Sequence, residues 1–236
     1  MIRTASYSDI GGRERNEDHY KQILGGNKGI CLVLADGLGG HGNGELASET
    51  ACRTVCSNWD GRVDQQSLIT LVKEAQKQVL GLHNRYYSMK TTIVVLITDQ
   101  EKAVWSHVGD SRLYHFYNKK LVFQTKDHSS SQIAVLLGDI TLDQIRFHED
   151  RSTLYRALGQ EGDVKVEAQE ETLALGHHAF LLCSDGFWEY VLETEMEEDL
   201  KTATDPEDWL QKMRTRLKQR IPDDNDNNTA AVLWLD

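Results

Sequence analysis

The sequence predicts an α+β domain in which sheets are sandwiched by helices. Short runs of strand type cluster along the chain instead of alternating with helices, which favours a layered sandwich over a parallel doubly wound sheet. Two of these runs, Ile30–Ala35 and Ile93–Ile97, are apolar almost throughout, as is typical of strands covered on both faces. Amphipathic helical patterns elsewhere in the chain provide the covering layers.

The strand-type runs are short, rich in β-branched and aromatic residues, and bounded by turn-forming residues. One early strand is expected directly after Asn16-Glu17-Asp18. The other strands are expected at Ile30–Ala35, Thr91–Thr98, Ala103–Val108, Arg112–Tyr117, Leu121–Thr125, Val164–Ala168, Ala179–Cys183 and Thr229–Leu235.

Three stretches have helical character. Residues Glu45–Asn58 form the first, and between Leu68 and Leu82 apolar residues recur every three or four positions, which predicts one apolar stripe. In the third, Asp205 can cap a helix whose first position is Pro206, and apolar residues then repeat at intervals of four.

Length and composition predict one globular domain over residues 1–236. The chain has 26 Lys and Arg against 37 Asp and Glu, a net charge of −11, which argues against nucleic acid or an anionic membrane as the main partner. No apolar run approaches the ~18 residues that suggest a membrane span. The 4 cysteines include no C-x-x-C pair, so a reduced, cytoplasmic protein is expected. A monomer is expected as well.

Acidic residues stand at the ends of several predicted strands. Asp36 and Asp185 each follow an apolar strand and precede Gly, Asp110 follows a third strand, and Asp226 and segment 16–18 lie before two others. Taken singly, an Asp-Gly pair is ordinary turn chemistry. Five such sites favour a cluster, and two carboxylates 4 Å apart repel by about 4 kcal/mol at an effective dielectric of 20. Oxygen ligands without His or Cys point to Mg²⁺ or Mn²⁺ as the compensating cation.

Seven sequence blocks then occur in a fixed order: Arg13-x-x-Asn16-Glu17-Asp18, Ala35-Asp36-Gly37-x-Gly39-Gly40-His41, Gly109-Asp110-Ser111-Arg112, Asp127-His128-Ser129, Arg156-Ala157-Leu158-Gly159, Ser184-Asp185-Gly186 and Asp226-Asn227-x-Thr229. In this order they resemble the metal-dependent protein phosphatases of type 2C, which act on serine and threonine, and especially the compact bacterial members. The resemblance spans residues 3 to 235. A single Asp-Gly pair would be worthless evidence, whereas seven ordered blocks are specific.

The resemblance implies an α-β-β-α sandwich of two antiparallel sheets flanked by helices, with a dinuclear Mn²⁺ or Mg²⁺ centre at one end. Asp36 would bridge the two ions, and the carbonyl group of Gly37 would be a further ligand. Asp185 and Asp226 would complete the ligand shell of the first ion.

The second ion would depend on Glu17 or Asp18, partly through water. A third, weaker ion is found in some bacterial members of the family. Asp110, together with Asp185, would be its candidate ligand in this chain.

The implied activity is hydrolysis of phosphoserine and phosphothreonine by in-line attack of a hydroxide activated at the dinuclear centre, without a phosphoenzyme intermediate. Arg13 would hold the substrate phosphate, which suits a planar guanidinium group. His41 would donate a proton to the leaving alkoxide or contact the substrate. Alternatively, His41 is a polar loop residue without a catalytic role. The implied partner is a protein phosphorylated by a Ser/Thr kinase, in a signalling role.

Two other functions stay open at this point: a catalytically inactive regulator of the same fold that binds phosphoproteins, and a phosphatase for small metabolites. The presence of every implied ligand and of Arg13 disfavours the first. A cysteine-phosphatase mechanism is disfavoured as well. Cys56 and Arg62 have the C-x5-R spacing, but Trp59 and Asp60 replace the small residues of a phosphate-binding loop.

The chain departs from the family pattern at two positions. Lys90 replaces a usual Gly before Thr91, so the turn there is expected to differ. Asn228 replaces an apolar residue, so the last strand is expected to start later. Segment 136–152 is expected to be the variable flap beside the site.

Three further features have structural interpretations. Arg112 is expected to be a structural ion-pair partner, although it could bind phosphate. His177 and His178 are expected to face solvent, and the acidic run Glu193–Asp199 to be a solvated helix face.

Overall fold

The computed structural model describes residues 1–25, 29–39 and 43–236. Two five-stranded sheets form its centre, and every neighbouring pair of strands is antiparallel. The first sheet has the order β1 (Ile2–Asp9), β10 (Asn228–Leu235), β9 (His178–Cys183), β6 (Arg112–Tyr117), β7 (Lys120–Gln124). The second has the order β2 (Asp18–Leu24), β3 (Ile30–Asp36), β4 (Ile93–Thr98), β5 (Lys102–Val108), β8 (Ala168–Thr172).

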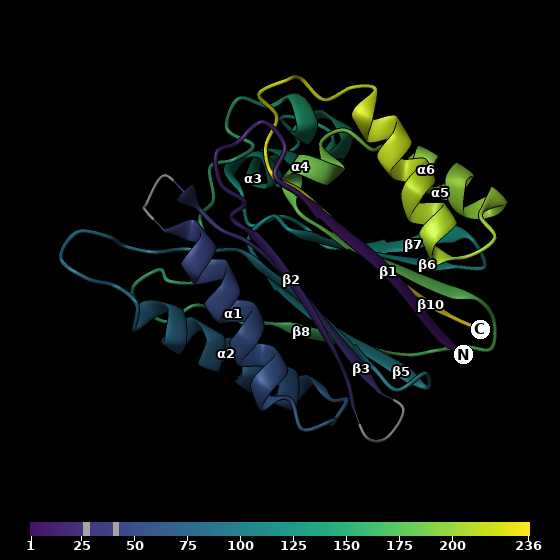
Figure 1. The fold of residues 1–236 in the computed structure, drawn as a ribbon, viewed down its shortest axis with the longest axis horizontal. Coiled ribbons are helices and arrows are strands. Elements are labelled where there is room, and N and C mark those ends of the chain that lie inside the picture. The colour runs from purple at the N-terminus through teal and green to yellow at the C-terminus, as the bar shows by residue number, and fades with distance from the viewer. Residues whose placement is uncertain (26–28, 40–42) are drawn as a thin grey trace.

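Helices cover the outer face of each sheet (Figure 1). Helices α1 (Gly44–Asn58) and α2 (Gln65–Leu80) pack on the second sheet. Helices α4 (Asp185–Trp188), α5 (Glu193–Thr202) and α6 (Pro206–Lys218) pack on the first. The expected α-β-β-α sandwich is therefore confirmed.

Strand β3 shows why an apolar run predicted a strand covered on both faces. Cys31, Val33 and Ala35 are buried in the core beneath α1 and α2. Ile30, Leu32 and Leu34 are buried in the core between the two sheets. Because successive side chains of a strand point to opposite faces, both sets must be apolar.

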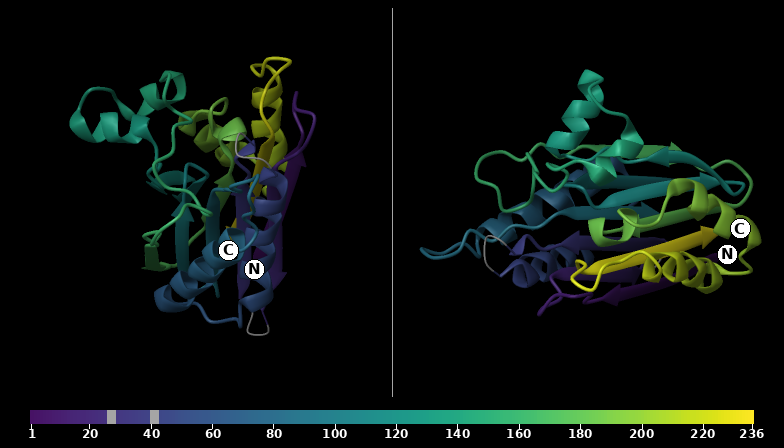
Figure 2. Two further views of the ribbon diagram at one scale, coloured as in Figure 1. Left: turned by 90° about the vertical axis from the view of Figure 1, so that its left-hand side faces the viewer. Right: turned by 90° about the horizontal axis from the view of Figure 1, so that it is seen from above.

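Segment 130–147 carries α3 (Ser130–Leu137) and the 3-10 helix η2 (Leu142–Phe147). Figure 2 shows it standing off one end of the sandwich. The expected flap, residues 136–152, thus begins at the end of α3 and contains η2. Several of its apolar side chains are exposed, including Leu136, Leu137 and Phe147.

All three helix predictions are confirmed, although α2 ends at Leu80 and Leu82 of the predicted stripe lies beyond it. Asp205 accepts a hydrogen bond from the backbone N–H of Asp208 at 2.9 Å, and Pro206 occupies the first position of α6.

All 4 cysteines are free and buried. Within the described ranges, no helix is long and apolar enough to cross a membrane.

Two strand predictions were wrong in position. A strand was expected at 164–168, but Val164 and Val166 pack into the core beside α2 as loop residues, and β8 forms at 168–172. The last strand starts at Asn228 and not later. Asn228 lies opposite Asp9 in the ladder and accepts a hydrogen bond from the Tyr7 hydroxyl at 3.0 Å, so a polar side chain is satisfied there.

The histidine pair at the start of β9 was wrongly expected to face solvent. His178 is buried, and its ring Nδ1 lies 2.9 Å from the Nε2 of His115. His177 is only partly exposed and packs edge-on against Trp234. A hydrogen bond to a second imidazole lets a polar ring enter the core without leaving its nitrogen unpaired.

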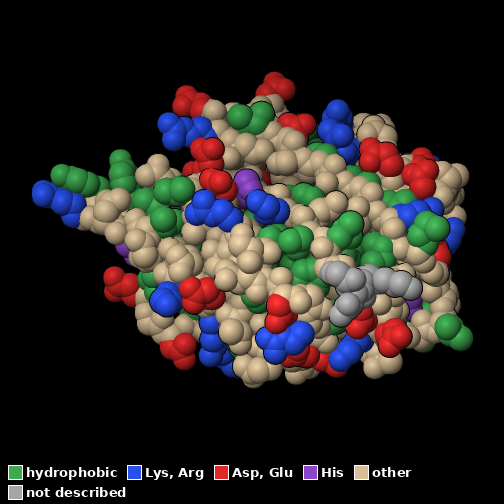
Figure 3. Space-filling view, turned by 60° about the horizontal axis from the view of Figure 1, so that its bottom comes forward, with side chains coloured by type: hydrophobic (Ala, Val, Ile, Leu, Met, Phe, Trp, Pro, Cys, Tyr) green, Lys and Arg blue, Asp and Glu red, His purple; other side chains and the backbone are tan. Residues whose placement is uncertain are grey.

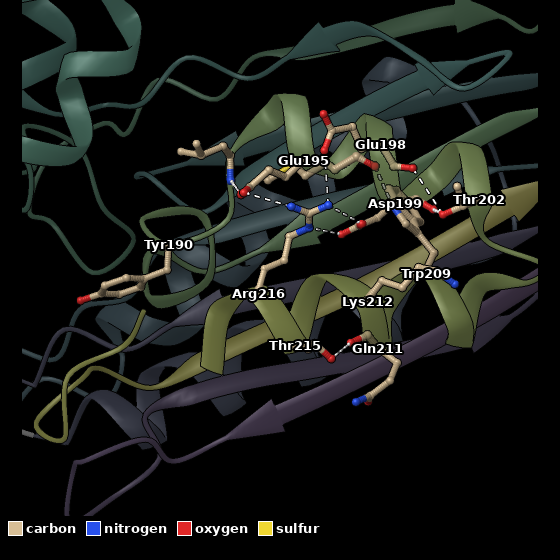
Figure 4. A network of polar contacts seen from close by, with 12 residues as sticks. Tyr190, Glu195, Glu198, Asp199, Thr202, Trp209, Gln211, Lys212, Thr215 and Arg216 are labelled. Atoms are coloured by element: carbon tan, nitrogen blue, oxygen red, sulfur yellow. Dashed lines mark hydrogen bonds and ion pairs between the residues drawn. The ribbon is translucent and has the colours of Figure 1, made fainter. Parts of the chain in front are cut away.

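The acidic run in α5 is not simply a solvated face, because Arg216 of α6 pairs with it (Figure 4). Arg216 donates two hydrogen bonds of 2.9 Å to Asp199 and one of 3.1 Å to Glu195. Arg220 also pairs with Glu195, and this hydrogen bond is the main reason that the pKa of Glu195 is lowered to about 2. Elsewhere, acidic and basic side chains are interspersed on the face seen in Figure 3.

Candidate active site

A cavity of about 750 Å³ opens where strand ends of both sheets meet. Asp36 ends β3, Asp110 follows β5, Asp185 begins α4 directly after β9, and Asp226 precedes β10. Most of the expected site residues line this cavity: Arg13, Glu17, Asp36, Gly37, Asp110, Asp185 and Asp226. Asp18 is buried next to it, and His41 lies outside the described residues.

The position of Asp36 is set by its backbone. Its N–H donates to the Thr92 hydroxyl at 3.0 Å, and its carbonyl oxygen accepts from Thr92 N–H and from the Thr91 hydroxyl, both at 2.8 Å. At the next residue, Gly37, a Cβ atom would collide with the backbone of Gly44 at the start of α1. A strand end and a helix start can approach this closely only because both positions are glycine.

Glu17 and Asp18 are adjacent but point to different partners. Glu17 accepts a hydrogen bond from the N–H of Gly44 at 3.1 Å, at the positive end of α1. Asp18 lies opposite Asp36 in the β2–β3 ladder and accepts from the Ser184 hydroxyl at 2.7 Å. Glu17 therefore reaches the site from the residue before β2, whereas Asp18 reaches it from the first residue of that strand.

Four carboxyl groups at this end are strongly perturbed. Burial, and then the neighbouring acidic residues, raise the pKa values of Asp36 and Asp185 well above the ordinary range. Burial also raises the pKa values of Asp18 and Asp110 to about 7. Such a group of buried acids favours either protons or a bound cation.

The donor set fits hard divalent cations. It consists of carboxylate oxygens, and buried Oδ1 atoms of Asp18 and Asp185 have no hydrogen-bond partner. Among the described residues, however, no three acidic, His or Cys side chains already form a group that could hold an ion. The buried oxygens without a partner nevertheless leave acceptor positions for a cation, which side-chain rotation and water ligands can complete. Ligation at this site therefore requires some side-chain rearrangement.

A family model described as Protein phosphatase 2C matches residues 7–231. The chain belongs to the protein phosphatase 2C family. A serine/threonine phosphatase of Listeria monocytogenes, stp, is 33% identical over 203 residues, which are 80% of this chain and 79% of that protein. Membership of this family makes the chain a phosphatase enzyme.

Solved structures of similar sequence share the fold. The serine/threonine phosphatase Stp1 from Staphylococcus aureus has a TM-score of 0.88 and 27% identity, over 100% of this chain and 96% of the other. The catalytic domain of the phosphatase PstP, in complex with two manganese ions, has a TM-score of 0.79 and 27% identity, over 100% and 99% of the two chains.

In this type 2C phosphatase, Arg13 lies beside one of the expected metal ligands. Its Nε and Nη2 donate to the two carboxylate oxygens of Asp226 at 3.1 and 3.0 Å, and both side chains are about half exposed. Asn227 holds the loop that carries Arg13, because its side-chain amide donates to the carbonyl oxygens of Ile10 and Arg15. The arginine expected to bind phosphate thus faces a carboxylate as well as the cavity.

The phosphatase also contains a buried ion pair, Arg112–Asp127, that packs on Trp188. The sequence predicted a structural role for Arg112 but none for Trp188. Arg112 donates to Asp127 at 2.8 and 2.7 Å and lies 3.5 Å above the ring of Trp188. The indole N–H of Trp188 donates to the backbone oxygen of Asp110 at 2.9 Å. The structural role expected of Arg112 is confirmed. The role of Trp188 carried no local sequence signal.

Cys56 does not resemble a nucleophile in this phosphatase. It lies in α1, is 3% exposed, and belongs to the core between that helix and the second sheet. A phosphate group could not reach its sulfur without opening the core. This burial argues against the cysteine mechanism suggested by the spacing to Arg62.

Proposed function

We propose that residues 1–236 form one catalytic domain that hydrolyses phosphoserine and phosphothreonine in proteins with the help of two divalent cations, Mn²⁺ or Mg²⁺. The observation that carries this proposal is the group of buried carboxyls with raised pKa values beside an arginine. The family membership and the serine/threonine phosphatase names of the relatives support it. The two manganese ions in a similar structure support the choice of cofactor.

Four residues would form the centre of the metal site. Asp36 would bridge the ions, the Gly37 carbonyl would be an additional ligand, and Asp185 and Asp226 would complete the shell of the first ion. Bound there, the ions would lower the pKa of water toward ~7 and neutralise charge on the phosphoryl group.

The second ion would be held by Glu17 and Asp18, in part through water. Asp18 already offers an unpartnered Oδ1 atom, and Glu17 is kept in place by its hydrogen bond to Gly44. Asp110, with Asp185, would serve a third and weaker site.

Arg13 would bind and orient the substrate phosphate. Its five N–H donors match phosphate oxygens, but its guanidinium now pairs with Asp226. Substrate binding would therefore exchange a half-exposed ion pair for a charge-assisted contact with phosphate. His41 is proposed as proton donor to the leaving alkoxide or as a substrate contact.

The proposed substrates are proteins phosphorylated by a Ser/Thr kinase, and the proposed setting is signalling in the cytoplasm by a monomer. A comparison of phosphopeptides with small phosphorylated metabolites tests the substrate class. We expect higher kcat/KM for the phosphopeptides. Higher values for the metabolites would favour the metabolite phosphatase instead.

Metal removal is the direct test of the mechanism. Hydrolysis of an aryl phosphate should vanish in EDTA and return with Mn²⁺. Asp36→Ala should abolish turnover and reduce the number of Mn²⁺ ions bound in calorimetry, whereas Asp163→Ala, at an exposed loop position, should change neither. Full activity in chelator would refute the metal mechanism.

Arg13→Ala separates phosphate binding from metal binding. Its catalytic efficiency should fall by about 1.5–3 kcal/mol, or about 10- to 150-fold, which is the scale of a charge-assisted hydrogen bond. Metal affinity should stay equal or rise, because the variant removes a cation that competes for Asp226. Arg53→Ala, an exposed arginine on α1, is the matched control. Loss of metals in Arg13→Ala but not in Asp36→Ala would show that the roles are reversed.

A further inference from the structure

A second cavity, of about 370 Å³, lies at the open edge between the two sheets. Strand β5 of the second sheet and β7 of the first contribute its aromatic wall, including Trp105 and Phe123, whose rings are 4.9 Å apart. His128 and Arg156 also line it. Both belong to ordered sequence blocks to which the proposed function assigns no role.

The ring of His128 has a defined proton arrangement. The ring Nδ1 accepts a hydrogen bond from the backbone N–H of Gly109 at 3.1 Å, and the backbone N–H of His128 donates to the Gly109 carbonyl oxygen at 2.9 Å. These two hydrogen bonds fix the ring against Gly109, which has a φ of 105° and leaves no room for a Cβ beside Thr92. Burial lowers the pKa of His128 to about 3, so the ring is neutral and its proton sits on Nε2.

Arg156 meets this same Nε2 atom. Its Nη1 lies 3.0 Å from Nε2 of His128, but both groups are donors and cannot hydrogen-bond to each other. In the described part of the chain no carboxylate pairs with Arg156. Glu167 lines the cavity, but its carboxylate is paired with Lys165. Two adjacent N–H donors therefore face this cavity without an acceptor.

We propose that the second cavity binds a small aromatic carboxylate, whose oxygens accept hydrogen bonds from Arg156 and from Nε2 of His128 while its ring packs against Trp105 and Phe123. A single negative charge suits the site better than a phosphate dianion, because Asp127 and Glu167 are also among the lining residues. The volume lies within the usual range of small-molecule sites.

This cavity is separate from the candidate active site. Leu154 and Ala157 line the active-site cavity, whereas the residues between them, Tyr155 and Arg156, line the second one. Segment 154–157 thus separates the two cavities. A ligand bound on one side of it does not need Arg13 on the other.

The probe for this site is 2-naphthoate, titrated into the Mg²⁺-loaded full chain by calorimetry, with the ring nitrogens of His128 followed by NMR. We expect saturable one-to-one binding that shifts the His128 signals. The neutral analogue 2-naphthalenemethanol should bind at least tenfold more weakly, because it lacks the anion. Inorganic phosphate should not displace the bound naphthoate.

Variants identify which cavity is occupied. Arg156→Gln should weaken naphthoate binding at least tenfold, and Arg156→Lys, which keeps the charge but loses the planar donor pair, should weaken it less. Arg53→Ala and Arg13→Ala should leave it unchanged. Thermal unfolding of each variant checks that it is folded.

Three outcomes would overturn the proposal: unchanged affinity in both Arg156 variants, loss of binding in Arg13→Ala, or phosphate binding more tightly than naphthoate at the same site. Because turnover is not measured, a failure of the proposed phosphatase mechanism leaves this test intact. If both Arg156 variants unfold, the native chain still tests the proposal. A naphthoate affinity less than tenfold above that of the alcohol, or His128 signals that do not shift, would then overturn it.

Discussion

Replacing Asp18 by Asn should stabilise the metal-free phosphatase at alkaline pH. Burial raises the pKa of Asp18 from its ordinary value of 3.8 to about 7. Between these two values the folded state keeps a proton that the unfolded state has lost. The stability contributed by this carboxyl is therefore fully present below pH 3.8 and is lost as the pH rises through 7.

The size of the effect follows from the same two values. At pH 5.5 the protonated carboxyl still contributes about 2 kcal/mol, and at pH 8 almost nothing. Asn carries no charge at either pH, and its side-chain oxygen can still accept from Ser184. The stability difference between variant and wild type should therefore rise by about 2 kcal/mol from pH 5.5 to pH 8, or roughly 4–8 °C in Tm for a chain of this size.

The quantity to measure is the difference in stability between Asp18→Asn and wild type, because other groups also titrate in this pH range. Burial lowers the pKa values of His107, His115 and His128, so these residues destabilise the fold as the pH falls below about 6.5. Their contribution has the opposite sign to that of Asp18, but it is the same in variant and wild type and cancels.

Thermal unfolding in EDTA at pH 5.5 and 8.0 provides the assay, with Asp163→Asn as the exposed control. If Asp18 is a metal ligand as proposed, Mn²⁺ at pH 8.0 should reverse the order, because Asn is a weaker ligand than an ionised carboxylate. If the stability difference between Asp18→Asn and wild type stays constant or falls as the pH rises, burial does not raise the pKa of Asp18 as described.

Three other predictions test single features. Arg112→Leu should lower the free energy of unfolding in urea by about 3–5 kcal/mol, because it leaves Asp127 buried without its partner; a loss under about 1 kcal/mol would contradict this. Cys56→Ser should keep kcat/KM within about twofold of wild type, since its sulfur is buried in the core, and an inactive, metal-binding variant would revive the cysteine mechanism. Asp205→Ala should cost about 1 kcal/mol in thermal or urea unfolding through loss of the α6 cap, and an unchanged stability would argue against that cap.

The interior strands and the principal helices could be predicted from sequence because their signals are local. The apolar run of β3, the stripe of α2, and the Asp205-Pro206 start of α6 each reflect interactions within a few residues. Strand β1 lacks such a signal. Its side chains are mostly only partly buried, and it forms by pairing with β10 more than 200 positions away.

The acidic residues of the site could also be found in the sequence, since strand ends that carry Asp are visible there. The raised pKa values of these residues could not be predicted from the sequence. The raised pKa of Asp36 depends on burial and on Asp18, Asp185 and Asp110, which long-range strand pairing brings near it. The same holds for Glu195, which is an ion-pair partner only because α6 places Arg216, and the turn after α6 places Arg220, beside it.

Sequence alone thus determined which residue types were available and which local elements they form. Only the tertiary structure decided that Arg13 pairs with Asp226, and that His128 and Arg156 present two donors to one cavity. The physical reason is that periodicity and capping act within one element. Desolvation, ion pairing and the shape of a cavity depend on atoms from elements that are distant in sequence.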